Sequence, residues 1–297
     1  MTPDTKNTPI YSICMCNYNM ADTLDVALRS ILEQIAATFE VVIVDDGSSD
    51  KSVEVIKALQ KEYQSLRLIE LERDPKRKLG LTRNISVQEA RGDYILLHLD
   101  CDDVTAPFIN DFAQVFHQIE KCRDTDFLLS GRPIQMGKKS FLLQHGPYRN
   151  IHRGEDRDLW SRLASIEACI PLDHKSLKTR LPKSKLELIY RAVYYTYDHL
   201  RNDFRKEKSL FKFLYFELTR LERFSWKMRI LRLAVTVPAW VKAMYEGPLP
   251  DAKMVAPHEG FGQYRIEHEK TFTEILQSHG RNPDWSSLSP EAKSIFE

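Results

Sequence analysis

The chain has 297 residues, of which 42% are hydrophobic and 29% charged, and its Lys and Arg (43) nearly balance its Asp and Glu (42). This composition excludes a generally disordered chain and suits one large unit with an added module, or two domains. The net charge of +1 argues against nucleic acid as a partner. The five cysteines are an odd number without regular spacing, which favours a reducing compartment.

The N-terminal segment 1–9 is polar and lacks the apolar core of a signal peptide. No stretch of about twenty uninterrupted apolar residues follows it. We therefore expect a cytoplasmic protein without a transmembrane helix.

The first hundred residues alternate between strand and helix patterns. Apolar runs of strand length occupy 10–16, 39–44, 66–71 and 94–99. The intervening segments carry apolar residues at helical spacing: 22–35 with Asp22 as N-cap, 53–59, and 81–90. Short connections between alternating strands and helices give right-handed crossovers, so the pattern predicts an α/β fold with a parallel, doubly wound sheet.

Two of these strands end in acidic residues. The run 94–99 is followed by Asp100, Asp102 and Asp103, and the run 39–44 by Asp45 and Asp46. Ligands of open α/β sheets bind outside the carboxyl ends of the strands, where carboxylates suit Mn²⁺ or Mg²⁺ shared with substrate phosphates. Solvated acidic turns are the simpler alternative. A Gly-x-Gly-x-x-Gly loop is absent after the first strand, so dinucleotide binding has no support.

Four motifs follow one another in a recognisable order. They are Asp45-Asp46-Gly47-Ser48-Ser49-Asp50, Gly80-Leu81-Thr82-Arg83-Asn84, Gly92-Asp93-Tyr94 leading to Leu99-Asp100-Cys101-Asp102-Asp103, and Gly154-Glu155-Asp156-Arg157-Asp158-Leu159-Trp160. Together they resemble the family 2 glycosyltransferases of the GT-A fold, over about residues 8–165. The resemblance implies a Rossmann-like, mostly parallel sheet in a domain at 8–170. Within it, 8–105 would bind the nucleotide sugar and 106–170 the acceptor, and 171–297 would form a mainly helical extension.

The resemblance also implies which residues bind the nucleotide-diphosphate sugar donor. Asp46 or its neighbour Asp45 would accept a hydrogen bond from the base. Arg83 would contact the base or a phosphate oxygen, and Asn17 and Glu155 would complete the substrate-binding set. A solvated helix arginine is the alternative for Arg83.

The acidic cluster after the fourth strand would hold the metal. By resemblance, Asp102 ligates the divalent ion, Mn²⁺ or Mg²⁺, directly, and Asp100 binds either the ribose or the metal's water shell. Asp103 is equally well explained as a carboxylate near a helix N-terminus.

Asp156 is the candidate general base for the acceptor hydroxyl. It lies in the first turn of a helix predicted at 155–168. The buried stripe of that helix would consist of Leu159, Leu163 and Ile166. The alternative is that Glu155 and Asp156 only complement the helix dipole. Direct displacement assisted by Asp156 would invert the anomeric centre.

The histidines are not distinguished by their spacing. His98 lies within the fourth strand, which favours a packing role. His152, His174 and His258 each remain open as an additional metal ligand, as found in some GT-A enzymes.

The second half lacks the Gln-x-x-Arg-Trp sequence of processive family members, which favours single additions to a glycan or polyprenyl-linked acceptor. From 174 to 232 there are 16 Lys or Arg against 6 Asp or Glu, a surplus of ten, with aromatic residues interleaved. The segment is either a helical subdomain covering the sheet or a surface that rests on anionic lipid. The second interpretation predicts peripheral attachment to the cytoplasmic face of a membrane.

Two other functions compete with glycosyl transfer. Asp100-Cys101-Asp102 partly matches the nucleophile motif of haloacid dehalogenase-type aspartyl phosphotransferases, although three strand and helix units precede it. The other is a GT-A scaffold that binds nucleotide without turnover.

Overall fold

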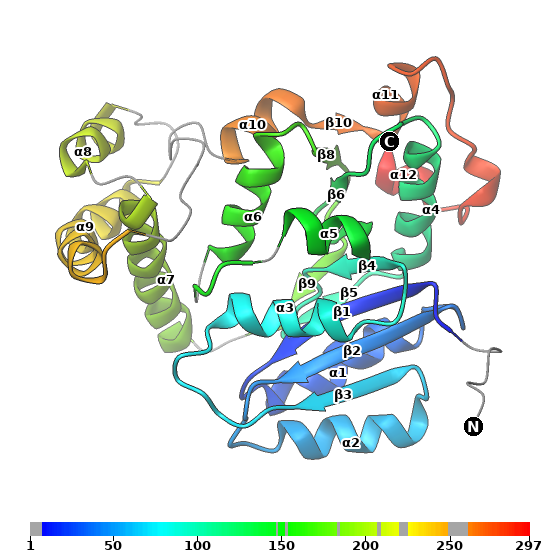
Figure 1. The fold of residues 1–297 in the computed structure, drawn as a ribbon, viewed down its shortest axis with the longest axis horizontal. Helices are drawn as coiled ribbons and strands as arrows, with labels where there is room; N and C mark the ends of the chain where they lie inside the picture. The colour runs from blue at the N-terminus through cyan, green and yellow to red at the C-terminus, as the bar shows by residue number, and fades with distance from the viewer. Residues whose placement is uncertain are drawn as a thin grey trace.

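The computed structural model describes residues 8–146, 148–151, 154–182, 185–206, 209–219, 225–248 and 261–297 (Figure 1). The strands are β1 (Tyr11–Asn17), β2 (Phe39–Asp45), β3 (Leu66–Glu70), β4 (Tyr94–Leu97), β5 (Asp103–Thr105), β6 (Leu128–Ser130), β7 (Gln135–Lys138), β8 (Cys169–Asp173), β9 (Lys178–Arg180) and β10 (Lys270–Thr271). The helices are α1 (Ala21–Leu32), α2 (Ser52–Glu62), α3 (Leu79–Glu89), α4 (Ile109–Glu120), α5 (Lys139–His145), α6 (Glu155–Ala164), α7 (Lys185–Lys206), α8 (Leu210–Thr219), α9 (Trp226–Glu246), α10 (Phe261–His268), α11 (Phe272–Gln277) and α12 (Lys293–Phe296), with a 3₁₀ turn at Trp285–Ser287.

Eight strands form the central sheet in the order β10-β8-β6-β7-β4-β1-β2-β3. All neighbours are parallel except β7, which runs antiparallel to both β4 and β6. The predicted α/β fold with a mostly parallel, doubly wound sheet is therefore confirmed. A separate two-stranded sheet pairs β5 with β9 and so joins the chain after β4 to the chain after β8.

Both faces of the sheet are covered, because its central strands are apolar on both sides. All seven residues of β2 are buried. In β1, Ile13 and Met15 pack into the core on the side of α1, α2 and α4, whereas Cys14 packs into the core on the side of α3, α5 and α6. This alternation is the two-residue period of a strand, and it fixes which helices meet at the carboxyl ends of β1 and β4.

Several predicted boundaries differ from the structure. α1 begins at Ala21, whose amide donates to the Asp50 carboxylate, so Asp22 lies in the first turn and is not the N-cap. β4 ends at Leu97, because His98 adopts a left-handed φ of 67°. α6 ends at Ala164, and Ile166, predicted to be buried, is 53% exposed.

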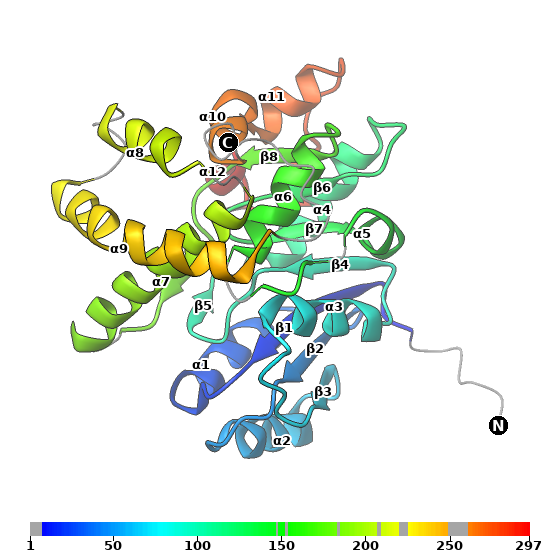
Figure 2. The ribbon, with the colours of Figure 1, turned by 60° about the vertical axis from the view of Figure 1, so that its left-hand side comes forward.

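The C-terminal part makes two kinds of contact. α7, α8 and α9 form a lobe beside the sheet, with α9 on the outside of α7 (Figures 1 and 2). The tail instead returns to the sheet, where β10 pairs with β8 and Phe272 and Phe296 enter the core beside α4. The domain boundary predicted at 170 falls within β8. Among the described residues, no helix is both long and apolar enough to cross a membrane.

Candidate functional site

The polar residues after β1 and β2 meet because the two strands are parallel and in register. Asn17 is paired with Asp45 at their carboxyl ends. The Asp45 carboxylate accepts four hydrogen bonds: from Asn17 Nδ2 (2.7 Å), the Ser48 hydroxyl (2.6 Å), and the amides of Gly47 (3.1 Å) and Ser48 (2.8 Å). A carboxylate offers about four lone-pair positions, so Asp45 is fully used in shaping this turn. Asn17 Oδ1 is buried without a hydrogen-bond partner among the described residues.

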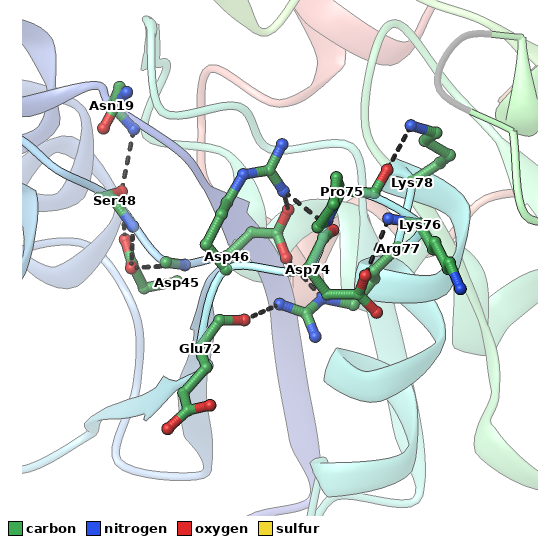
Figure 3. A network of polar contacts seen from close by, with 12 residues as sticks. Asn19, Asp45, Asp46, Ser48, Glu72, Asp74, Pro75, Lys76, Arg77 and Lys78 are labelled. Carbon is green, nitrogen blue, oxygen red and sulfur yellow. Dashed lines mark hydrogen bonds and ion pairs between the residues drawn. The ribbon is translucent and has the colours of Figure 1, made fainter.

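Asp46 is the carboxylate of this pair that points toward other charges (Figure 3). Its oxygens form ion pairs with Arg77 Nε (2.5 Å) and Arg73 Nη1 (2.8 Å). The Arg73 guanidinium also lies over the Tyr18 ring, 4.5 Å from its centroid. Neither arginine was singled out from the sequence. An arginine stacked on an aromatic ring next to a carboxylate resembles a surface for a flat, polar ligand.

The three carboxylates after β4 form one cluster. Asp100, Asp102 and Asp103 each offer an oxygen, and these oxygens lie within 4.8 Å of one another. Asp102 and Asp103 are buried, whereas the side chain of Asp100 is 38% exposed. Partial burial raises the pKa of Asp100, and the neighbouring charges of Asp102 and Asp103 raise it further against the effect of Arg83 and Lys178. Three oxygens at this spacing fit a hard divalent cation.

Basic side chains from the second half of the protein face this cluster. Arg180 Nε and Nη2 donate to the two oxygens of Asp103 at 2.8 and 3.1 Å, and Lys178 Nζ lies 2.7 Å from Asp103. Arg191, on α7, donates to Asp102 at 3.1 Å. The pairing of β5 with β9 brings Lys178 and Arg180 to the cluster.

These cations belong to the basic surplus seen in the sequence. Sequence reasoning assigned that surplus to a solvated or lipid-facing surface. The structure instead turns Lys178, Arg180 and Arg191 toward the acidic cluster. No local sequence pattern predicts that basic residues face the acidic cluster, because this arrangement depends on the pairing of two strands that lie far apart in the sequence.

Arg83 connects α3 to α6. Its Nε donates to Glu155 Oε1 at 2.9 Å, and both side chains are buried. The charge of Arg83 acts to lower the pKa of both Asp100 and Asp156. The Arg83 guanidinium therefore lies within electrostatic reach of the acidic cluster and of the candidate base. The alternative of a solvated helix arginine is therefore wrong.

The segment 148–151 fixes the position of α3. Asn84 exchanges hydrogen bonds with the backbone of Tyr148, each at 2.8 Å, and the Gly80 amide donates to Ile151 at 3.2 Å. A Cβ on Gly80 would lie 1.9 Å from the Arg149 carbonyl oxygen. The lack of a side chain at Gly80 thus allows the backbone at Arg149 to pass close to α3.

Glu155 and Asp156 begin α6 after Gly154, which takes a left-handed φ of 75° as the N-cap. Burial raises the pKa of Glu155, and the charge of Asp156 adds to this against the effect of Arg83. The charges of Arg83 and Arg157 and the hydrogen bond from the Arg157 amide hold the pKa of Asp156 below its usual range despite its burial. Of the two carboxylates, Asp156 is therefore the one whose ionised form is favoured more strongly.

The histidines near the site are structural. Burial lowers the pKa of His98 to about 3, and its Nε2 lies 3.3 Å from the Tyr148 hydroxyl. His174 accepts a hydrogen bond from the Arg132 amide at Nε2 (2.7 Å), and its Nδ1 lies 2.7 Å from the Lys175 carbonyl oxygen. Both nitrogens of His174 are occupied, so its proposed role as a metal ligand is wrong. His152 and His258 lie outside the described residues.

The comparisons with known proteins agree with this arrangement. An uncharacterized glycosyltransferase of Methanocaldococcus jannaschii is 27% identical over 254 residues, which cover 70% of this chain and 84% of that protein. Two solved structures share the fold at a TM-score of 0.54: S. aureus TarS 1–349 in complex with UDP-GlcNAc, and the mannosyltransferase PcManGT from Pyrobaculum calidifontis in complex with GDP-Man and Mn²⁺. The first is 15% identical and covers 80% of each chain; the second is 18% identical and covers 84% of this chain and 79% of that one.

The family profile described as "Glycosyl transferase family 2" matches residues 12–178, more than half of the chain. The matched range contains all four motifs, the acidic cluster and Lys178 of β9, and it ends before Arg180. This match leaves no support for an aspartyl phosphotransferase. The chain belongs to glycosyl transferase family 2 and is a glycosyltransferase with the GT-A fold.

Proposed function

We propose that this glycosyltransferase moves one sugar from a nucleotide-diphosphate sugar to an acceptor hydroxyl, with a divalent metal ion and with inversion at the anomeric carbon. The observation that carries the proposal is the position of Arg83. Its buried guanidinium binds Glu155 and lies within electrostatic reach of both Asp100 and Asp156. Arg83 thus links the acidic cluster to an ionised carboxylate that can act as a base.

Asp102 and Asp100 are the residues that would hold the metal, with Asp103 beside them. A bound Mn²⁺ or Mg²⁺ would stabilise the negative charge that develops on the diphosphate as it leaves. The solved structure of PcManGT contains Mn²⁺ together with GDP-Man, which supports a metal-dependent reaction here.

Lys178, Arg180 and Arg191 would add to the binding of the diphosphate. In the structure these basic side chains pair with Asp102 and Asp103. A metal ion that binds the same carboxylates would compete with the basic side chains for them. Once these carboxylates are shared with a divalent ion, the basic side chains gain by turning to phosphate oxygens, which are the preferred partners of Arg and Lys in such sites.

Asp46 is the proposed acceptor for the nucleotide base, because the hydrogen-bonding positions of Asp45 are already filled. Asn17 contributes through its buried, unpartnered Oδ1. The stacked Arg73 and Tyr18 lie on the same side as Asp46 and would contact the flat face of the base.

Asp156 is the proposed general base. As an ionised carboxylate it can accept the proton of the acceptor hydroxyl as that oxygen attacks the anomeric carbon. Glu155 would position Arg83 and the acceptor. A single displacement of this kind inverts the configuration of the sugar.

The proposed acceptor is a glycan or a polyprenyl-linked sugar, and the proposed location is the cytoplasm, with peripheral attachment to the membrane face. The absence of a Gln-x-x-Arg-Trp sequence from the chain supports single addition.

A thermal-shift screen of nucleoside diphosphates with and without Mn²⁺ tests the donor and the metal together. We expect one nucleoside diphosphate to stabilise the protein only when Mn²⁺ or Mg²⁺ is present, and Asp102→Asn to abolish this response. Asp124→Asn is the matched control, because Asp124 is exposed and lies outside the cluster. An Asp102→Asn protein that responds to metal like the parent would refute the metal assignment.

A further inference from the structure

The outer side of α9 is an uninterrupted apolar strip on the surface of the protein. Seven large side chains are between 39% and 86% exposed: six follow one another at steps of three or four residues, and Tyr245 adjoins the last of them. They are Trp226, Ile230, Leu233, Val237, Val241, Met244 and Tyr245, called here the α9 face. The exposed small residues Ala234 and Pro238 fill the spaces between them. A contiguous apolar surface of this kind marks an interaction site in a folded protein.

The opposite side of α9 is already used for packing. Thr236, Ala239 and Ala243 are buried, and the two alanines pack against Leu200 and Phe204 of α7. The α9 face is therefore the side that the lobe turns outward, and Figure 2 shows α9 lying across the front of α7. With 21 residues, the helix is about 30 Å long.

The ends of the α9 face carry aromatic and basic residues together. The Lys227 ammonium lies 5.7 Å from the Trp226 ring centroid, and the Lys242 ammonium lies 5.3 Å from that of Tyr245. Both lysines are exposed. Glu246 is the acidic residue of α9, and it lies 3.5, 3.4 and 3.8 Å from Arg201, Arg205 and Lys242. The exposed charged residues of α9, Lys227 and Lys242, are thus both positive.

We propose that the α9 face docks flat on an anionic lipid surface. An amphipathic helix lies in a membrane interface when its apolar side enters the acyl boundary and its basic residues meet anionic headgroups. Trp and Tyr favour that boundary because one end of each ring is apolar and the other polar. Lys227 and Lys242 have stems long enough to reach the headgroups while their neighbours are immersed.

A second copy of the chain fits the α9 face less well. In an isologous dimer the same surface meets itself, so the basic ends of two antiparallel helices would lie together. Lys227 of one copy would face Lys242 of the other, and the acidic Glu246 is already paired within its own copy with Arg201, Arg205 and Lys242. Charge complementarity thus favours anionic lipid.

The docking surface adjoins the candidate active site through α7. The same helix packs against α9 and presents Arg191 to Asp102. This inference deepens the proposed location and rests on the proposed function only for the acceptor, since lipid binding itself requires neither donor nor metal. Membrane attachment at α9 would favour an acceptor carried by a lipid.

Vesicle flotation without donor or metal tests the docking directly. The protein is expected to float with phosphatidylglycerol–phosphatidylcholine vesicles at low salt, less at high salt, and weakly with pure phosphatidylcholine. Val237→Glu and Val241→Glu should each reduce binding by about tenfold or more, because a carboxylate enters the apolar boundary. Lys227→Gln and Lys242→Gln should each reduce it by about fivefold, as expected for one basic residue near an anionic surface.

Val26→Glu is the matched control, because Val26 is an equally exposed valine on α1, away from the lobe. It should bind vesicles like the parent. Thermal unfolding and the metal-dependent nucleotide response should remain unchanged in all variants, which separates failure of docking from failure of the proposed function. The proposal is overturned if the parent does not float at low salt, or if Val241→Glu floats like the parent. It is equally overturned if the parent is a dimer in solution that Val241→Glu dissociates.

Discussion

At the scale of single residues, the adjacent carboxylates of Glu155 and Asp156 differ in environment. Glu155 is buried against Arg83, and the charges of Arg83 and Arg157 favour the ionised form of Asp156. The simpler explanation of both residues as complements to the α6 dipole does not account for the buried contact with Arg83.

We therefore predict that Asp156→Asn lowers turnover about 10²–10⁴-fold, the usual contribution of a general base, while donor and metal binding stay close to those of the parent. Glu155→Gln is the comparison. It should lower thermal stability, because Arg83 keeps its buried charge without a counter-ion, and it should reduce turnover less. Steady-state kinetics with donor-binding measurements decide the ranking, and the reverse ranking would assign the base to Glu155.

His98 should make folding stability depend on acid. Its pKa is about 6.5 when unfolded and is lowered to about 3 by burial in the folded protein. Between these values the unfolded chain binds a proton that the folded protein does not, so stability is complete above pH 6.5 and falls as the pH drops. The expected slope is about 1.4 kcal/mol per pH unit.

His98→Asn removes this titration and tolerates the left-handed φ of 67° at this position. Urea unfolding between pH 6 and 4 should therefore show a shallower loss of stability than in the parent. His174, whose pKa is lowered to about 4, remains in the variant and keeps part of the slope. An unchanged slope would contradict the assignment of the acid sensitivity to His98.

At the scale of elements, the crossing of α3 by the segment 148–151 sets the position of Arg83. Gly80 is where the two backbones come closest, since an added Cβ would lie 1.9 Å from the Arg149 carbonyl oxygen. Because that oxygen belongs to the backbone, it can move away from an added Cβ only if the segment 148–151 moves with it.

Gly80→Ala should therefore cost about 2–3 kcal/mol of unfolding free energy and weaken donor binding by displacing Arg83. Gly280→Ala is the control: its Cβ meets no atom within 4 Å, and its φ of 70° alone should cost about 1 kcal/mol without an effect on donor binding. Chemical denaturation and nucleotide titration measure both. Equal costs for the two variants would rule out the clash as the reason for Gly80.

At the scale of the whole molecule, the second half of the chain supplies the counter-charges of the acidic cluster. Lys178 and Arg180 reach Asp103 from β9, and Arg191 reaches Asp102 from α7. The sheet domain and the helical lobe are thus joined at the candidate metal site.

Arg180→Gln should lower the melting temperature without metal, because the buried Asp103 loses its bidentate partner. It should also strengthen Mn²⁺ binding several-fold and weaken nucleoside diphosphate binding in the presence of Mn²⁺. Arg132→Gln is the control, since Arg132 is similarly exposed and pairs with Asp173 and Glu269. Calorimetric titration separates the two effects, and a loss of affinity for both ligands would disprove the exchange of partners.

The sequence by itself determined the fold class and the order of the motifs. Strand-length apolar runs with helical segments between them specify a parallel sheet, because each pattern has its own period and short connections allow one handedness. The acidic residues at the ends of 39–44 and 94–99 predicted the location of the site for the same reason. These features are local, so neighbouring residues are enough to reveal them.

Only the tertiary structure decided which charged groups meet. The ion pair of Arg83 with Glu155 joins residues 72 positions apart, and the bond of Arg191 to Asp102 joins residues 89 apart. Likewise, the sequence does not distinguish Asp45 from its neighbour Asp46. In the structure, Asp45 accepts the hydrogen bonds of the turn, whereas Asp46 faces Arg73 and Arg77. The reason is physical: a side chain's partners are set by strand pairing and helix packing, which no local pattern of residues encodes.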